Sequence, residues 1–287
     1  MQVLITGAGG QMGKEWEYFC TNSGIVFHAF DSKALDVTKR EELERITEET
    51  SPDVIINCAA YTKVDQAEDE EGRAEEINSI AVATLARICA DKNIKLVHYS
   101  TDYVFSGSES DRDKYPEGYD EEAPASPQNA YGRTKYNGEM AIVESGCEYL
   151  ILRVSWLCGL HGNNFVKTML RLAQEREELS VVNDQLGCPA FTKDVVAQTK
   201  ALLEVGEFGV FHLGSKGIIS WYDFAKEIFA LKQIDIIVNP VSSDSFPTKA
   251  KRPSFSKLST KKISTIPSVK ILGWKESLRE LISEIDR

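Results

Sequence analysis

Residues 3–13 read Val-Leu-Ile-Thr-Gly-Ala-Gly-Gly-Gln-Met-Gly, a short apolar run that leads through a glycine-rich turn into a helical pattern. A strand, a turn and a helix in this order bring backbone amides and a helix N-terminus together, where they bind a pyrophosphate. Gly7, Gly10 and Gly13 have the spacing G-x-x-G-x-x-G, which differs by one residue from the usual dinucleotide fingerprint. The alternative is a flexible turn without a ligand, but the flanking strand and helix favour a dinucleotide site.

Similar units follow this first one along the chain. Repeated strand-then-helix units build a parallel sheet with helices on both faces. The sequence therefore predicts the α/β class, with a Rossmann-type doubly wound parallel sheet in residues 1–155 and a smaller α/β substrate-binding domain in residues 156–287. Strands are expected at residues 26–30, 54–57, 94–99, 179–182 and 210–213, and helices at 41–50, 65–76, 78–90, 129–139, 164–178 and 220–230. The acidic stretch 65–76 is predicted to be a solvated helix face.

Composition and charge exclude several classes. The chain has 287 residues, 42% of them hydrophobic, which is enough for a sizeable core. Its net charge of −11 argues against nucleic-acid binding. The N-terminus has no long apolar segment, so we predict neither a signal peptide nor a membrane span. The six cysteines show no C-x-x-C or metal-type spacing, which indicates reduced thiols in a cytoplasmic protein without a metal site.

Both an acid and a base follow the strand at residues 26–30. Asp31 lies about 20 residues beyond the glycines, where an acidic side chain accepts the ribose hydroxyls of NAD. Lys33 would accommodate the 2′-phosphate of NADP. The sequence therefore leaves NADPH and NADH as alternatives. Asp36 either lies by the adenine or caps the helix that begins near Thr38.

The ends of two later strands also suggest a ligand site. Open α/β sheets bind ligands beyond the carboxyl ends of their strands. Small residues at 58–60 follow one strand there and leave room for a cofactor. The next strand ends at Ser100 and Thr101, and a hydroxyl fixed at this edge donates a hydrogen bond to a carbonyl oxygen.

Tyr131 and Lys135 are four residues apart in a predicted helix, so the phenol and the ammonium lie on one face. A tyrosine loses its proton near pH 10, and a neighbouring cation lowers that pKa toward the working range. The pair would then exchange a proton with a substrate oxygen. The same spacing occurs by chance on amphipathic helices, but the strand–helix units before it favour a catalytic pair.

Residues 245–275 contain several lysines, one arginine and no acidic residue. A nucleotide-sugar diphosphate needs such cations, and arginine binds it in a bidentate manner. The alternative is a solvated basic loop; for Arg252 we favour binding.

Seven motifs distributed along nearly the whole chain carry a resemblance: Cys-Ala-Ala-Tyr-Thr-Lys-Val-Asp (58–65), Ser-Thr-Asp-Tyr-Val-Phe (100–105), Tyr-Gly-Arg-Thr-Lys (131–135), Arg-Val-Ser-Trp-Leu (153–157), Gly-Asn-Asn-Phe-Val-Lys-Thr-Met-Leu (162–170), Val-Asn-Asp-Gln-Leu-Gly-Cys-Pro (182–189) and Lys-Arg-Pro (251–253). Together they resemble the extended short-chain dehydrogenase/reductase superfamily and, within it, the dTDP-4-dehydrorhamnose reductase family.

The resemblance implies that NADPH or NADH reduces the C4 keto group of a nucleotide-sugar substrate, dTDP-4-dehydro-L-rhamnose, in a monomer or homodimer. It also implies that later segments return to the first sheet. The implied catalytic residues are Thr101, Tyr131 and Lys135. The expected cofactor-binding residues are Gly7, Gly10, Gln11, Met12, Gly13, Asp31, Ser32, Lys33, Asp36, Val37, Ala59, Ala60, Tyr61, Asn78, Tyr131 and Lys135. Those expected for the substrate are Thr62, Val64, Thr101, Asp102, Tyr103, Trp156 and Arg252.

Some positions depart from the family pattern. Cys158, Ala190 and Lys251 replace the residues common in the family, which concerns the substrate more than the chemistry. Some members hold a metal through glutamates at a dimer interface. Glu15 matches one of these, but Lys193 stands where another is expected, so no metal is predicted.

The sequence is also compatible with two alternative functions. A nucleotide-sugar epimerase or dehydratase would use the same three residues without net consumption of NAD(P)H. A non-catalytic, cofactor-binding regulatory subunit would need none of them, and the intact Thr101, Tyr131 and Lys135 argue against it.

Overall fold

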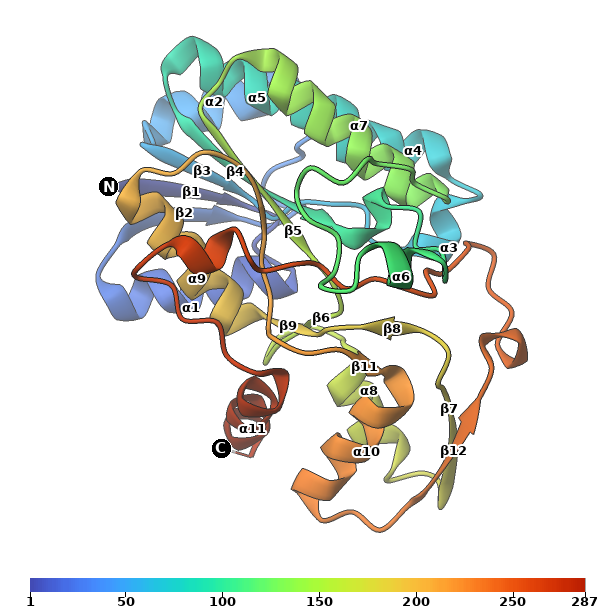
Figure 1. Cartoon of the computed structure of the whole chain (residues 1–287). Coiled ribbons are helices and arrows are strands. Elements are labelled where there is room, and N and C mark those ends of the chain that lie inside the picture. The colour runs from blue at the N-terminus through green and yellow to red at the C-terminus, as the bar shows by residue number, and fades with distance from the viewer. Residues whose placement is uncertain (287) are drawn as a thin grey trace.

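The computed structural model describes residues 1–286, and within them a six-stranded parallel sheet forms the centre (Figure 1). The strands lie in the order β10 (Gly209–His212), β5 (Tyr149–Val154), β4 (Lys95–Thr101), β3 (Val54–Asn57), β1 (Gln2–Thr6) and β2 (Val26–Phe30). The chain places β2 on one side of β1 and β3 on the other, and such a switch point is where open α/β sheets bind ligands. The predicted Rossmann-type doubly wound parallel sheet is confirmed.

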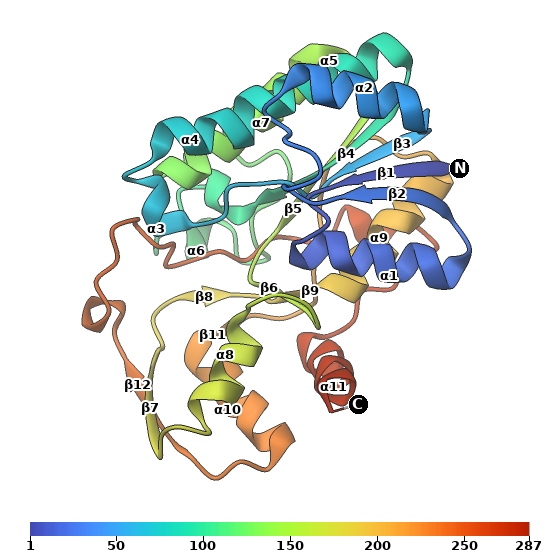
Figure 2. The same cartoon turned by 180° about the vertical axis from the view of Figure 1, so that it is seen from behind.

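Helices cover both faces of this sheet (Figures 1 and 2). Alternate residues of β1 serve the two layers, since Val3 and Ile5 pack in one core cluster and Leu4 in another. This period of two explains why the strand is apolar throughout. One layer contains α1 (Gln11–Ser23) and α9 (Thr192–Val205), and the other contains α2 (Arg40–Thr50), α5 (Ala81–Lys92) and α7 (Ala130–Ser145).

A smaller lobe with its own apolar core lies beyond β5. Ser220 caps one of its helices, as predicted, because its Oγ accepts a hydrogen bond of 3.0 Å from the Asp223 amide. The chain returns from this lobe to the large sheet through α9 and β10. The lobe contains α8 (Phe165–Leu172), α10 (Trp221–Lys232), α11 (Trp274–Ile285) and the strand pairs β6 (Leu157–Cys158) with β9 (Ala190–Phe191), β7 (Glu178–Val182) with β12 (Ile237–Val241), and β8 (Leu186–Gly187) with β11 (Ile219–Ser220).

Three expected helices, at 65–76, 78–90 and 164–178, differ from the prediction. Residues 64–80 form α3 (Val64–Ala67), α4 (Glu71–Glu75) and a π-helical turn (Glu76–Ile80) instead of continuous helices. The turn contains Asn78, whose side chain bonds both backbone groups of Tyr61, at 2.8 and 3.1 Å. The wider turn thus serves a tertiary contact. The helix expected at 164–178 ends at Leu172, after which i→i+3 hydrogen bonds turn the chain toward β7.

Close packing of α7 depends on two of its glycines. A Cβ on Gly138 would lie 2.1 Å from the Asn78 carbonyl oxygen, and one on Gly132 would lie 2.2 Å from the Tyr103 carbonyl oxygen. Real Cβ atoms essentially never approach so closely. The glycines therefore bring α7 against the π-helical turn and against a 3₁₀ turn at Asp102–Val104.

We expect Gly138→Ala to lower the free energy of unfolding by about 1–3 kcal/mol, the usual cost of overpacking. Gly72→Ala is the matched control, because nothing lies within 4 Å of a Cβ there. Alanine also favours a helix over glycine, so the control should be neutral or slightly stabilising. Urea unfolding measures both; equal stability of the two variants would contradict the packing role.

Candidate active site

A crevice of two adjoining cavities lies at the carboxyl ends of the central strands. The β2-side cavity, about 560 Å³, contains Asp31 and Asp36 in its wall. The β4-side cavity, about 540 Å³, extends to Tyr131 and Trp156. Each volume suits a small-molecule ligand. The two cavities share part of their wall, namely Gly10, Cys58, Ala59 and Ala60.

Most of the expected site residues line this crevice. Those in the β2-side cavity are Gly7, Gly10, Asp31, Ser32, Asp36, Val37, Ala59 and Ala60. Those in the β4-side cavity are Gln11, Met12, Thr62, Val64, Thr101, Asp102, Tyr103, Tyr131, Lys135 and Trp156, together with Gly10, Ala59 and Ala60.

Three residues that were expected to bind the cofactor lie outside the cavity walls. They serve close packing or internal hydrogen bonds instead. A Cβ on Gly13 would lie 2.5 Å from the Ala8 Cα, so this glycine serves packing. The Tyr61 hydroxyl donates to Glu70 at 2.8 Å. Asn78 is fully buried and joins Tyr61 to α7 by donating to the Thr134 hydroxyl at 3.1 Å.

Two expected cations also lie outside the walls. Lys33 contributes its backbone N–H, which donates to Asp31 Oδ1 at 2.9 Å, but its side chain does not line the crevice. Arg252 donates to the Tyr103 hydroxyl at 2.9 Å and to Asp65 Oδ2 at 2.5 Å. Arg252 therefore fixes the hydroxyl of Tyr103, which lines the β4-side cavity, without lining that cavity itself.

Other lining residues were missed in the sequence. Gly9 belongs to the same glycine turn and is open toward the cavity, since its nearest neighbour would be 3.5 Å from a Cβ. Arg73 belongs to the acidic stretch 65–76, and no motif in the sequence indicates that it shares a cavity with Asp31. The other missed residues are Leu35, Thr38 and Ile77 on the β2 side, and Tyr99, Val154, Leu157, Gly162 and Asn163 on the β4 side, whereas Cys58 and Ser100 line the crevice as the strand ends predicted.

The two acids of the β2-side cavity have fixed carboxylates. Asp31 Oδ1 also accepts the Ala34 amide at 3.1 Å. Asp36 accepts the hydroxyl and amide of Thr38 at 2.7 and 3.1 Å, and these bonds lower the pKa of its carboxyl. Asp36 lines the cavity and does not cap α2, which begins after Lys39.

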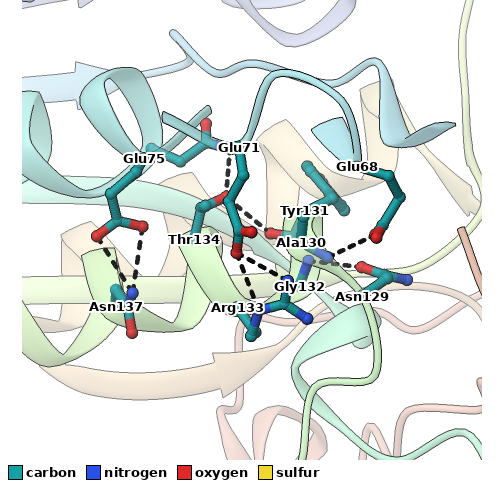
Figure 3. Close-up of polar contacts among 11 residues, drawn as sticks. Glu68, Glu71, Glu75, Asn129, Ala130, Tyr131, Gly132, Arg133, Thr134 and Asn137 are labelled. Carbon is teal, nitrogen blue, oxygen red and sulfur yellow. Dashed lines mark hydrogen bonds and ion pairs between the residues drawn. The ribbon is translucent and has the colours of Figure 1, made fainter. Parts of the chain in front are cut away.

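Tyr131 lies in the first turn of α7, which polar contacts hold in place (Figure 3). Asn129 Oδ1 accepts the Gly132 amide at 2.8 Å, and Glu68 accepts the Ala130 amide at 2.7 Å. These bonds satisfy amides that a helix start leaves free. Together they fix the position of the tyrosine.

The acidic stretch 65–76 is solvated as predicted, since most of its acidic side chains are exposed, and in addition it contacts α7. Glu71 accepts Arg133 at 2.7 Å, and Glu75 accepts the Asn137 amide group at 3.1 Å (Figure 3). The carboxylates thus follow successive turns of the neighbouring helix, a partnership that periodicity within one segment does not reveal.

Burial raises the pKa of Tyr131 above its ordinary value near 10, although the Thr101 side chain partly opposes this shift. Edge-to-face contact with Tyr103, at 5.5 Å between ring centroids, adds to the apolar surroundings. The phenol therefore keeps its proton at neutral pH.

The predicted effect of Lys135 on Tyr131 is wrong in this structure. The ammonium points toward β4, where it donates to the Tyr99 carbonyl oxygen at 2.7 Å and lies 2.9 Å from His98 Nε2. Burial lowers the pKa of Lys135 from 10.5 to about 8. The helical spacing placed both residues on one cavity wall, but the ammonium is bound by the backbone of β4, an interior strand of the sheet.

Unsatisfied polar atoms show that the β4-side cavity suits a polar ligand. Asp102 Oδ2 and Ser100 Oγ are buried and have no hydrogen-bond partner among residues 1–286. An unsatisfied buried polar atom costs about 1–3 kcal/mol, which a ligand hydroxyl can recover. With open glycines and small alanines beside them, these residues fit a dinucleotide and a sugar.

Trp156 forms the opposite wall of this cavity in a strained conformation. Its φ of +50° is rare for a large side chain and is typical of functional sites. The indole stacks on Trp221 with 3.5 Å between centroids. A Cβ on Gly187 would lie 2.8 Å from Trp156 Cε2, so that glycine makes room for the indole.

Metal and membrane features are absent from the described residues. Within residues 1–286 no three His, Cys, Asp or Glu side chains gather as metal ligands. Glu15 instead accepts the Thr192 hydroxyl at 2.7 Å. None of the helices formed by these residues is long and apolar enough to cross a membrane.

We expect Asp102→Asn to change how stability depends on pH. Asp102 is 5% exposed, and burial raises the pKa of its carboxyl from 3.8 to about 7. A raised folded-state pKa means that stability is present at low pH and lost as the pH rises through about 7.

Between about pH 5 and pH 8 the wild type should therefore lose about 2–3 kcal/mol relative to the uncharged variant. Urea unfolding of both proteins across this range is the measurement. A constant difference between them would show that the carboxyl does not titrate there.

Comparisons with known proteins give matches over the full chain. The family model described as RmlD substrate binding domain matches residues 1–287. A dTDP-4-dehydrorhamnose reductase of Aggregatibacter actinomycetemcomitans is 38% identical over 98% of this chain and 98% of its own length. A dTDP-4-keto-6-deoxy-D-glucose reductase of Streptomyces niveus is 40% identical over 89% of this chain and 87% of its own. The crystal structure of dTDP-4-dehydrorhamnose reductase from Bacillus anthracis str. Ames in complex with NADP has a TM-score of 0.93, with 40% identity over 99% of both chains.

Proposed function

The chain belongs to the RmlD substrate binding domain family, and we propose on this basis that it is a dTDP-4-dehydrorhamnose reductase that uses NADPH or NADH. It reduces the C4 keto group of dTDP-4-dehydro-L-rhamnose to give dTDP-L-rhamnose. One observation carries the proposal most directly. The Tyr131 phenol lines the same cavity as the Thr101 hydroxyl, and a glycine-lined cavity adjoins it.

In this proposal each residue of the catalytic group has a separate task. Bound NAD(P)H supplies the hydride that reaches C4. Tyr131 donates its phenolic proton to the C4 oxygen, and its raised pKa keeps it in the donor form beforehand. Thr101 donates a hydrogen bond to the same oxygen and orients the carbonyl. Lys135, anchored on β4, binds a ribose hydroxyl of the cofactor.

The two lobes divide the binding work. We assign cofactor binding to residues 1–155 and substrate binding mainly to residues 156–287, with Asp102, Tyr103 and Trp156 beside the sugar. The cytoplasm is the compartment that we propose, because all six cysteines are free thiols.

Tyr131→Phe should slow turnover by about 10²–10⁴-fold, the usual contribution of a general acid, and leave cofactor binding nearly unchanged. Oxidation of NADPH or NADH in the presence of dTDP-4-dehydro-L-rhamnose, followed by absorbance, is the measurement. Tyr18→Phe is the control, since Tyr18 is 63% exposed on α1, outside the crevice. Turnover of the Tyr131 variant at the wild-type rate would overturn the assignment.

The same assay separates the proposal from its rivals. An epimerase or dehydratase recycles its nicotinamide and would oxidise no net NAD(P)H with the keto sugar. A regulatory subunit would bind the dinucleotide and leave every 4-keto sugar unchanged. Stoichiometric oxidation with the dTDP sugar, exceeding that with other 4-keto sugars, is the result that we expect.

We propose that Arg252 favours binding of the nucleotide sugar indirectly, by fixing the Tyr103 hydroxyl while its other nitrogen pairs with Asp65. Arg252→Gln should raise the KM for the nucleotide sugar by about 10-fold or more, the value of one charge-assisted hydrogen bond. Because the reacting groups stay in place, kcat should change less than about threefold.

Lys251→Gln is the neighbouring control, because the exposed Lys251 side chain has no ion pair with any residue of the described chain. Steady-state kinetics with varied sugar measures both variants. Equal KM values for the Arg252 variant and the wild type would exclude this role.

A further inference from the structure

Acidic side chains outnumber basic ones in the wall of the β2-side cavity. Asp31 and Asp36 both contribute carboxylates to its wall. Among the described residues that line it, Arg73 is the one cation. Lys33, which the sequence suggested for this task, is not in the wall.

Arg73 lies on α4, and its guanidinium is free to bind a ligand. It has no ion pair or side-chain hydrogen bond with any residue of the described chain, 1–286. The nearby carboxylates are already engaged, because Glu70 accepts from Tyr61, Glu71 from Arg133 and Glu75 from Asn137. Figure 3 shows the last two pairs on the side of the helices that faces α7. These three carboxylates therefore have partners other than Arg73.

Asp31 restricts which adenosine moiety fits this end of the crevice. Its Oδ1 is occupied by two backbone amides, and its Oδ2 has no partner among the described residues. A free carboxylate oxygen accepts a ribose hydroxyl but repels a phosphate. A 2′-phosphate with nearly two negative charges therefore needs a cation on the facing wall. The hydroxyls of Ser32 and Thr38 line the same cavity and add donors.

We propose that Arg73 binds the 2′-phosphate of NADPH and sets the preference of this protein for NADPH over NADH. The inference rests on the proposed function, which places the adenosine end of the cofactor in the β2-side cavity. Arginine suits the task because its planar fork binds a phosphate through two parallel hydrogen bonds. NADH lacks that phosphate and relies on Asp31 instead.

Direct binding tests this inference without turnover. Dissociation constants for NADPH and for NADH are measured by titration calorimetry with the full chain and no sugar present. Arg73→Gln should weaken NADPH binding by about 10-fold or more, the value of a lost charge-assisted pair. NADH binding by the same variant should stay within about threefold of the wild type.

Two further variants control for position and charge. Lys33→Gln removes the cation favoured by sequence position alone and should leave both affinities nearly unchanged. Arg87→Gln removes an exposed arginine of α5, outside both cavities, and should also have no effect. Arg73→Lys keeps the charge but loses the planar guanidinium, so its affinity for NADPH should lie between those of the wild type and Arg73→Gln.

Equal weakening of both dinucleotides by Arg73→Gln would overturn the inference, since it would place Arg73 away from the 2′-phosphate. So would a loss of NADPH affinity in Lys33→Gln alone. A wild-type protein that binds neither dinucleotide would overturn the proposed function itself. Unchanged affinities in the Arg73 variant, with normal binding by the wild type, would refute only the role of Arg73.

Discussion

The structure of the crevice depends on one buried cation. The Lys135 side chain is only 1% exposed, yet its ammonium reaches the Tyr99 carbonyl oxygen on β4. A buried charge is tolerated only where it has polar partners, so α7 must lie where this lysine meets the backbone of β4. Glu139, one turn later on the same face, pairs with Arg153 of β5 at 2.6 Å. The two contacts hold the helix at a fixed height over two neighbouring strands, and Tyr131 comes to face Thr101 as a result.

Such an approach of helix to sheet needs contributions from segments far apart in the chain. Gly132 and Gly138 remove the side chains that would keep α7 away from the turns at Tyr103 and Asn78. Asn78 then fixes the loop after β3, and the acidic helices α3 and α4 supply carboxylates along the helix. Acidic residues that look dispensable in the sequence are therefore part of the support of the tyrosine.

The fold was largely predictable because its signals are local: apolar strands buried on both faces, a glycine turn and regular strand–helix units. The residues at strand ends, such as Asp31 and Thr101, were predictable for the same reason, since topology gathers those ends at one edge. The direction in which a side chain points was not predictable. Spacing placed Lys135 and Tyr131 on one face, but the direction of the ammonium depends on β4. Arg73 also has no local signal, because it lies in an acidic stretch and belongs to no motif that indicates a shared cavity with Asp31 and Asp36.

Three titratable groups of the β4-side cavity change pKa in the directions that favour their uncharged forms. Burial raises the pKa of Tyr131, raises that of Asp102 to about 7 and lowers that of Lys135 to about 8. One cause, removal from water, explains all three shifts, whereas a cation beside the phenol would have lowered the first. In the proposed reaction, a cavity that disfavours charge would keep Tyr131 protonated until the substrate oxygen takes the proton. Reduction of a carbonyl consumes one proton with each hydride, so a site that stores this proton on the phenol suits reduction better than one that stores a phenolate.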